Sequence, residues 1–128
     1  MQLVLTAPLP YDEFAHLMLR SYLIVTDSGG IQEEAAALGK PVLVARDKTE
    51  RGESVERGLS LLIGRERMVV RDAVERLLRD GDAYRSMARA ECPYGDGHAA
   101  VRIVDILRRA YGSGGGTSAG AAAAREEA

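Results

Sequence analysis

The segment from Tyr22 to Glu34 constrains the fold of this chain more than any other, because it passes from a strand pattern through glycines into a helix pattern. Tyr22–Thr26 is a short apolar run with β-branched residues, which is typical of a strand buried on both faces. Gly29-Gly30 then predicts a sharp turn, since glycine lacks the Cβ that restricts backbone angles. Ile31–Leu38 favours a helix. The segment therefore predicts a strand, a turn and a helix in direct succession.

The residues after this helix predict its end and a return to the sheet. Gly39-Lys40-Pro41 places a glycine suited to a left-handed cap before a proline that cannot continue a helix. Val42–Ala45 predicts the next strand, which completes a βαβ unit. The start of such a helix has backbone N–H groups without intrahelical partners, and it carries the positive end of the helix dipole. A phosphate group can bind there through the backbone alone.

The same alternation extends over most of the chain. Further apolar runs predict strands at Gln2–Thr6 and Leu59–Ile63. Apolar residues at helical spacing predict helices at Tyr11–Arg20, 65–79, Asp82–Ala90 and His98–Tyr111. Strands that alternate with helices form parallel sheets, so we predict an α/β fold, a Rossmann-like parallel sheet with flanking helices. We expect one domain over residues 1–111 and a disordered Gly/Ala-rich tail over residues 112–128.

Three segments of this predicted fold follow strands and should meet at one edge of the sheet. They are the loop before Phe14, the turn Ser28–Gly30 and the segment Arg46–Glu53, which belongs to a polar stretch, Arg46–Gly58, that is a loop or a short helix. Ligands of open α/β sheets bind at the carboxyl ends of the strands. We therefore expect a binding site where these three segments converge.

Composition excludes several classes of function. The 17 Lys and Arg residues against 19 Asp and Glu give a formal charge of −2, so the chain lacks the basic surface expected for binding nucleic acid or an anionic membrane. A single cysteine, Cys92, excludes an internal disulfide and suits the cytoplasm, which is where we place the protein. His16 and His98 have no carboxylate or cysteine at metal-ligand spacing, so we expect no metal and no cofactor.

Four strings of residues closely resemble the C-terminal half of the non-hydrolysing UDP-N-acetylglucosamine 2-epimerases. They are Thr26-Asp-Ser-Gly-Gly-Ile-Gln-Glu-Glu-Ala35, Leu38-Gly-Lys-Pro-Val42, Arg46-Asp-Lys-Thr-Glu-Arg51 and Pro93-Tyr-Gly-Asp-Gly97. The resemblance runs from about Pro8 to about Tyr111. It implies the second half of a glycosyltransferase-B architecture. It also implies an isomerase for UDP-GlcNAc and UDP-ManNAc in cell-surface polysaccharide biosynthesis.

The resemblance also implies roles for six residues. Phe14 would pack on the uracil, Ser28, Gly29 and Gly30 would meet the diphosphate, Glu34 would hold the ribose and Arg51 would contact the nucleotide. The residue types alone leave a structural role open for each. Phe14 also suits the core of its helix, Ser28–Gly30 a helix cap and turn, and Glu34 and Arg51 a solvated surface.

The family's acid and base groups lie outside the matched region, so we assign no catalytic residue and expect this chain alone to be inactive. A separate N-terminal half and a homodimer remain open as partners beside the UDP-sugar. Two alternatives also remain open, the donor-binding half of a UDP-sugar glycosyltransferase and a non-catalytic UDP-sugar binding fragment.

Overall fold

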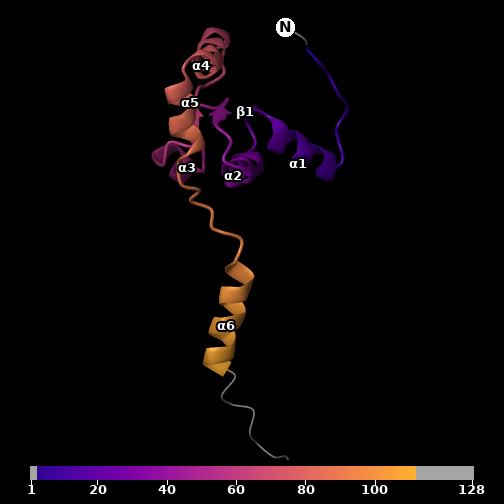
Figure 1. Cartoon of the computed structure of the whole chain (residues 1–128), viewed down its shortest axis with the longest axis vertical. Coiled ribbons are helices and arrows are strands. Elements are labelled where there is room, and N and C mark those ends of the chain that lie inside the picture. Colours follow the sequence, from indigo (N-terminus) through magenta and orange to yellow (C-terminus); the bar gives the residue numbers. More distant parts are fainter. Residues whose placement is uncertain (1–2, 112–128) are drawn as a thin grey trace, which may run out of the picture. The chain divides into compact units, whose positions relative to one another are not determined.

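The computed structural model describes residues 3–111 of the chain, which divide into two units at Asp96 and Gly97 (Figure 1). The first unit contains a three-stranded parallel sheet in the order β1-β2-β3. Its strands are β1 (Ile24–Thr26), β2 (Val42–Val44) and β3 (Ser60–Leu62). Ile24 lies opposite Val42, which in turn lies opposite Ser60. The predicted parallel α/β fold is confirmed, and the tail expected at residues 112–128 lies outside the described residues.

A helix follows each of the three strands, as the alternating pattern predicts. The first unit contains α1 (Tyr11–Arg20), α2 (Gly29–Ala37), α3 (Gly52–Glu56), α4 (Arg67–Arg79) and α5 (Gly81–Ala88). The second unit contains α6 (Ala99–Tyr111). The short α3 resolves the alternative left open for the polar segment after β2. In the described part of the chain, no helix has both the length and the apolar character needed to cross a bilayer.

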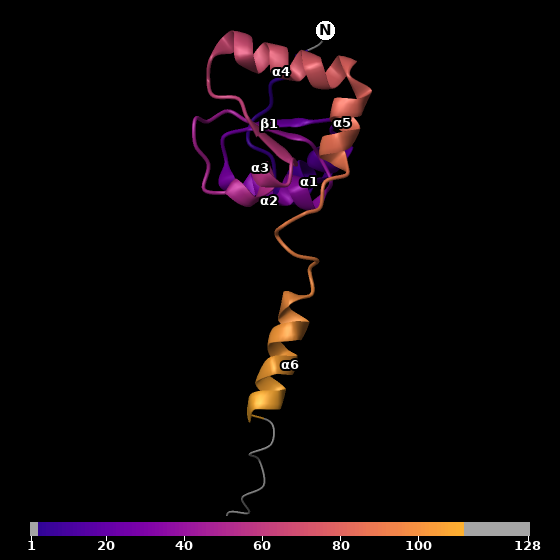
Figure 2. The same cartoon turned by 90° about the vertical axis from the view of Figure 1, so that its left-hand side faces the viewer.

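The sheet of the first unit has helices on both faces (Figure 2). In Figure 2, α4 lies above the strands and α1, α2 and α3 lie below them. Side chains of β2 alternate between the two layers: Val42 and Val44 pack with Ala35 of α2, whereas Leu43 packs with Leu77 of α4. All three residues of β2 are fully buried. The central strand therefore holds the two helical layers together.

The strand predicted at Gln2–Thr6 is wrong for the described residues 3–6. These residues form no strand, and Leu3, Val4 and Leu5 are 78%, 70% and 86% exposed. Figure 1 shows this indigo segment apart from the strands. A strand exists only where a neighbour accepts and donates its backbone hydrogen bonds. Within the described residues, the sheet has no strand on the side of β1 away from β2.

Helix ends in the first unit follow local sequence signals. Gly39 has a φ of 64° directly after α2, as predicted for a left-handed cap. The Asp80 carboxylate accepts hydrogen bonds from the N–H groups of Asp82 and Ala83 at the start of α5, both at 3.0 Å. These caps fix where each helix begins and ends and thus where the adjoining loops leave the sheet.

Candidate functional site

The candidate site lies at the start of α2, directly after β1. The Ser28 N–H donates to Thr26 Oγ1 at 3.0 Å, so the chain turns immediately beyond the strand. The Gln32 N–H donates to the Ser28 carbonyl at 3.3 Å as the helix begins. The N–H groups of Gly29, Gly30 and Ile31 precede that bond and have no carbonyl one turn back in the helix. The Ser28 side chain makes no capping hydrogen bond and is exposed.

The glycines of this segment serve a different purpose from the sharp turn predicted for them. Among the described residues, the glycines with positive φ are Gly39, Gly58, Gly64, Gly95 and Gly97. Gly29 and Gly30 instead form the first turn of α2, in a backbone conformation that any residue adopts. A Cβ on Gly30 would meet no atom within 4 Å, and a Cβ on Gly29 would lie 4.0 Å from the guanidinium of Arg51. The glycines therefore leave the helix start without side-chain atoms of its own.

Arg51 comes from the loop between β2 and α3 and lies beside this helix start. Its Nε forms an ion pair with Glu33 of α2. The backbone N–H of Arg51 donates to Thr49 Oγ1 at 3.1 Å, and the Thr49 hydroxyl donates to Gln32 Oε1 at 2.9 Å. The Ser54 hydroxyl donates to the Arg51 carbonyl at 2.9 Å. Both the side chain and the backbone of Arg51 are thus attached to α2.

Glu34 faces α1 on the other side of α2. The Tyr11 hydroxyl donates to Glu34 Oε2 at 2.9 Å, and this hydrogen bond to a carboxylate raises the pKa of Tyr11. Tyr11 and Glu34 line a hollow of about 380 Å³ between the two helices, together with His16, Met18 and Leu38. Glu34 is therefore available to accept hydrogen bonds from hydroxyl groups that enter this hollow.

Phe14 lies on α1 and is half-buried. It lines a hollow of about 320 Å³ with Thr26 at the end of β1 and Ile31 of α2. The structure thus places an aromatic ring in a hollow that also borders the first turn of α2.

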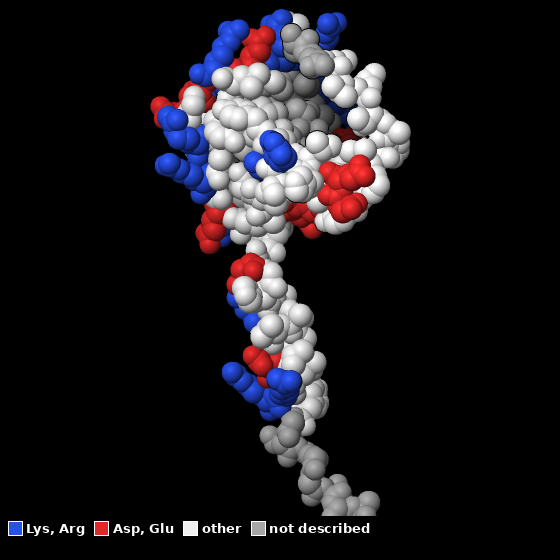
Figure 3. Space-filling model, turned by 45° about the vertical axis from the view of Figure 1, so that its right-hand side comes forward, with Lys and Arg blue, Asp and Glu red and all other residues white. Residues whose placement is uncertain are grey.

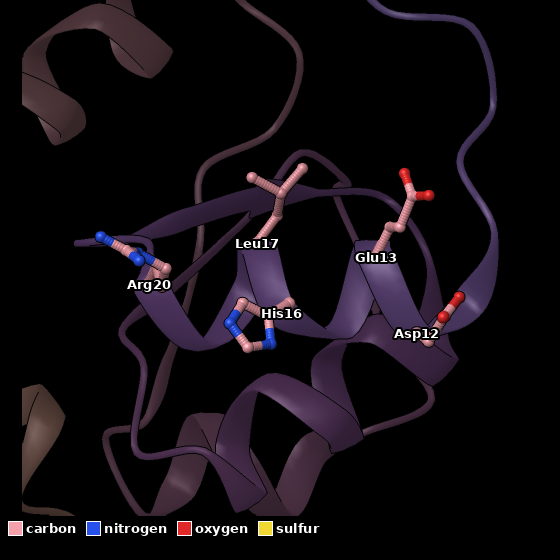
Figure 4. Close-up of a pocket in the computed structure, with 5 residues that line it drawn as sticks. All are labelled: Asp12, Glu13, His16, Leu17 and Arg20. Carbon is pink, nitrogen blue, oxygen red and sulfur yellow. The ribbon is translucent and has the colours of Figure 1, made fainter.

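Another hollow, of about 420 Å³, lies on α1 and shares Asp12 and His16 with the hollow between α1 and α2 (Figure 4). Asp12, Glu13, His16, Leu17 and Arg20 line it. All five side chains come from one helix, and Figure 4 shows Glu13 and Leu17 pointing away from His16. Among residues 3–111, no three or more His, Cys, Asp and Glu side chains are placed to hold a metal ion. The groups that converge are those around the start of α2.

Charge on the surface is mixed. Figure 3 shows a broad, mostly uncharged area on the face in view, with a basic group within it and basic and acidic side chains around its margin. A hollow of about 690 Å³ at the loop after β2 has the same character, since Arg46, Lys48 and Arg65 line it together with Asp47 and Glu50. An anionic ligand would therefore be recognised by particular groups such as Arg51 and the helix start, and less by the field of the whole surface.

Four residues of the site were not predicted as ligand contacts or as partners of such contacts. Gln32 and Glu33 belong to the string Thr26–Ala35 that carries the resemblance but were given no ligand contact, and Thr49 and Tyr11 had no role either. Thr49 had a local signal, because a hydroxyl two residues before a backbone N–H commonly accepts from it. The remaining pairings join residues far apart in sequence and had none.

Comparison with known proteins identifies the family. A sequence profile described as UDP-N-acetylglucosamine 2-epimerase matches residues 1–108. The chain belongs to the UDP-N-acetylglucosamine 2-epimerase family. The resemblance seen in the glycine segment, the loop after β2 and the Pro93–Gly97 string is thereby confirmed.

Members of the 2-epimerase family with high similarity come from several bacteria. The chain is 55% identical over 106 residues to the UDP-N-acetylglucosamine 2-epimerase of Yersinia pestis and 50% identical over 105 residues to that of Escherichia coli K12. These matches cover 83% and 82% of this chain but only 28% of each relative. The chain thus spans little more than a quarter of the length of the 2-epimerases it matches.

Solved 2-epimerase structures share the fold. One crystal structure of a UDP-N-acetylglucosamine 2-epimerase superimposes with a TM-score of 0.79 at 48% identity, covering 83% of this chain and 29% of that one. The Neisseria meningitidis 2-epimerase, solved with UDP-GlcNAc bound, gives a TM-score of 0.77 at 45% identity over 81% of this chain and 28% of that one.

Proposed function

We propose that this chain is the UDP-binding part of a 2-epimerase that interconverts UDP-GlcNAc and UDP-ManNAc. The observation that carries the proposal is the open start of α2. There, the N–H groups of Gly29, Gly30 and Ile31 lie beside a guanidinium, and no side chain fills the space above Gly30. Amide groups at a helix start and an arginine together form a site for a diphosphate. The UDP-GlcNAc in the Neisseria relative supports this choice of ligand.

The diphosphate would occupy the space between the helix start and Arg51. In the family reaction UDP leaves carbon 1 of the sugar and then returns, so negative charge develops on the phosphate oxygen that departs. The helix N–H groups and the Arg51 guanidinium are fixed before the ligand arrives, and fixed donors stabilise such charge without reorganising. The Ser28 hydroxyl, which caps no N–H group, would add one more donor.

The nucleoside would extend from the diphosphate toward α1. Phe14 lies on that side and would pack against the uracil ring. Glu34 opens to the hollow between α1 and α2 and would accept hydrogen bonds from the ribose hydroxyls. In this arrangement the ribose would lie between the Glu34 carboxylate and the diphosphate. The two negatively charged groups would therefore be kept apart.

The acid and base that act on the sugar would come from the remaining part of the enzyme, as a continuous chain or as a separate partner. Elimination across carbons 1 and 2 requires an acid and a base positioned on either side of the sugar ring. The site at α2 supplies donors for phosphate and no such pair. A second copy of the chain stays open as a further partner.

Titration of the chain with UDP, followed by calorimetry, tests the nucleotide site. The Arg51 side chain is 35% exposed, so we take the lower end of the range for a charge-assisted contact, about 1.5 kcal/mol, and expect Arg51→Ala to weaken UDP roughly tenfold. Glu34→Ala should weaken UDP and uridine alike. Arg71→Ala on α4 is the matched control, because Arg71 pairs with Asp72 and is exposed. Unchanged affinity in both site variants would refute the assignment.

Deuterium exchange tests whether the acid and base groups lie outside this chain. We expect no deuterium at carbon 2 when the chain alone is incubated with UDP-GlcNAc in deuterated water and followed by proton NMR. Exchange that copurifies with the chain would place an acid and a base here. They would then have to be found among His16, His98, Asp47, Glu50 and Glu53.

A further inference from the structure

We infer that Glu33 is a positioning residue that holds the Arg51 guanidinium with one edge turned toward the diphosphate. The inference rests on the function proposed above, and it gives Glu33, which was not expected to contact the ligand, a part in binding. Three observations support it: the contacts of the Arg51 guanidinium, the hydrogen bonds that attach its loop to α2, and the exposure of the charges around it.

A guanidinium carries one N–H on Nε and two on each terminal nitrogen, and in Arg51 the Nε group and the terminal groups have different neighbours. Nε of Arg51 is bound by the Glu33 carboxylate. A Cβ on Gly29 would lie 4.0 Å from both Cζ and Nη2 of Arg51, so the end of the guanidinium borders the open helix start. Glu33 therefore binds the guanidinium through Nε and leaves the terminal edge, formed by Nη1 and Nη2, for the proposed diphosphate.

The loop that carries Arg51 is fixed to the same helix by a second connection. Gln32 is completely buried, and its Oε1 accepts from Thr49, whose Oγ1 in turn accepts from the Arg51 N–H. Adjacent residues of α2 thus hold the backbone and the side chain of one arginine. A long side chain that is ordered before binding loses less conformational entropy when the ligand arrives.

The Glu33 carboxylate also repels a diphosphate, and this repulsion would weaken binding. Glu33 and Arg51 are 41% and 35% exposed, and solvent screens the repulsion between partly exposed charges. A carboxylate that competed with phosphate would occupy the terminal edge of Nη1 and Nη2, whereas Glu33 binds Nε. Orientation of Arg51 therefore outweighs repulsion, and removal of Glu33 weakens binding of the diphosphate.

The test compares Glu33→Ala and Glu33→Gln with the wild-type chain by titration with UDP and with uridine. Immobilising one mobile side chain corresponds to a change of roughly 2- to 10-fold in affinity. We expect Glu33→Ala to weaken UDP by that factor and to leave uridine unchanged. Glu33→Gln should fall between, because glutamine still offers an oxygen to Nε. In the Arg51→Ala background, Glu33→Ala should have no further effect on UDP.

A second measurement does not depend on ligand. The Nε–H resonance of Arg51 in the ¹⁵N–¹H NMR spectrum should be slow to exchange with water in the wild-type chain and fast in Glu33→Ala. Thermal midpoints of the variants show whether the fold is kept.

Several results would overturn the inference. Tighter UDP binding by Glu33→Ala would make Glu33 a competitor of phosphate. An equal loss for UDP and uridine would mean a general structural role, and an unchanged Nε–H resonance would mean that the ion pair does not fix Arg51. Failure of the proposed function has a different signature, because the wild-type chain would then bind no UDP, and the inference would fall with it.

Discussion

Substitution of Gly29 by alanine should separate the stability of the fold from the binding of nucleotide. Gly29 is the first residue of α2, and its φ is not in the left-handed region. An added Cβ would lie 4.0 Å from the Arg51 guanidinium, which is ordinary van der Waals contact. Alanine in place of a helical glycine stabilises by about 0.4–1 kcal/mol, chiefly by restricting the unfolded chain. We therefore expect the Tm to rise by about 2–6 °C.

The same methyl group should impair UDP binding. It would stand between the N–H groups at the start of α2 and the Arg51 guanidinium, where a phosphate oxygen has to approach a backbone nitrogen to about 2.9 Å. Loss of one charge-assisted hydrogen bond costs about 1.5–3 kcal/mol. UDP affinity should therefore fall by roughly 10- to 150-fold.

Thermal scans with and without UDP, together with calorimetric titration, measure both effects on one sample. The matched control is Gly81→Ala, the same change at the first residue of α5, where an added Cβ would meet only the flexible Arg85 side chain at 3.1 Å. This control should keep its UDP affinity. If Gly29→Ala binds UDP like the wild type, the diphosphate does not lie at the helix start. A lower Tm in Gly29→Ala would instead show that Gly29 does not have a helical conformation that alanine can adopt.

Two further predictions concern the scaffold of the site. Leu43→Ala empties a fully buried position in the central strand and should lower the free energy of unfolding by about 2–5 kcal/mol in a urea titration, whereas Leu61→Ala, at a 41% exposed position, should cost much less. The Asp80 carboxylate accepts from the Ala83 N–H, which lowers its pKa below the ordinary value, so the unfolded chain takes up the proton first. Wild-type stability should fall as the pH drops below about 4, and the stability of Asp80→Asn should change less there, as thermal scans between pH 3 and 7 would show.

The sequence predicted those parts of the fold that depend on local pattern. Burial of Val42–Val44 on both faces follows from an unbroken apolar run, and the end of α2 follows from Gly39 at a left-handed position. The apolar run Leu3–Leu5 carries the same local signal as a strand, yet it is exposed and unpaired. Pairing depends on a neighbouring strand, which a segment does not encode by itself.

The sequence predicted where the candidate site lies in the fold, but it did not predict which side chains contact one another there. Parallel topology alone brings the end of β1 and the loop after β2 to one edge of the sheet. It does not say which of two adjacent glutamates on α2 would meet which neighbour. Successive helical residues point about 100° apart, so Glu33 is directed to the loop that carries Arg51, and Glu34 to Tyr11 of α1. Two identical side chains side by side thus acquire different partners, one an arginine and the other a tyrosine. Which glutamate meets which partner depends on where α1 and the loop after β2 lie relative to α2.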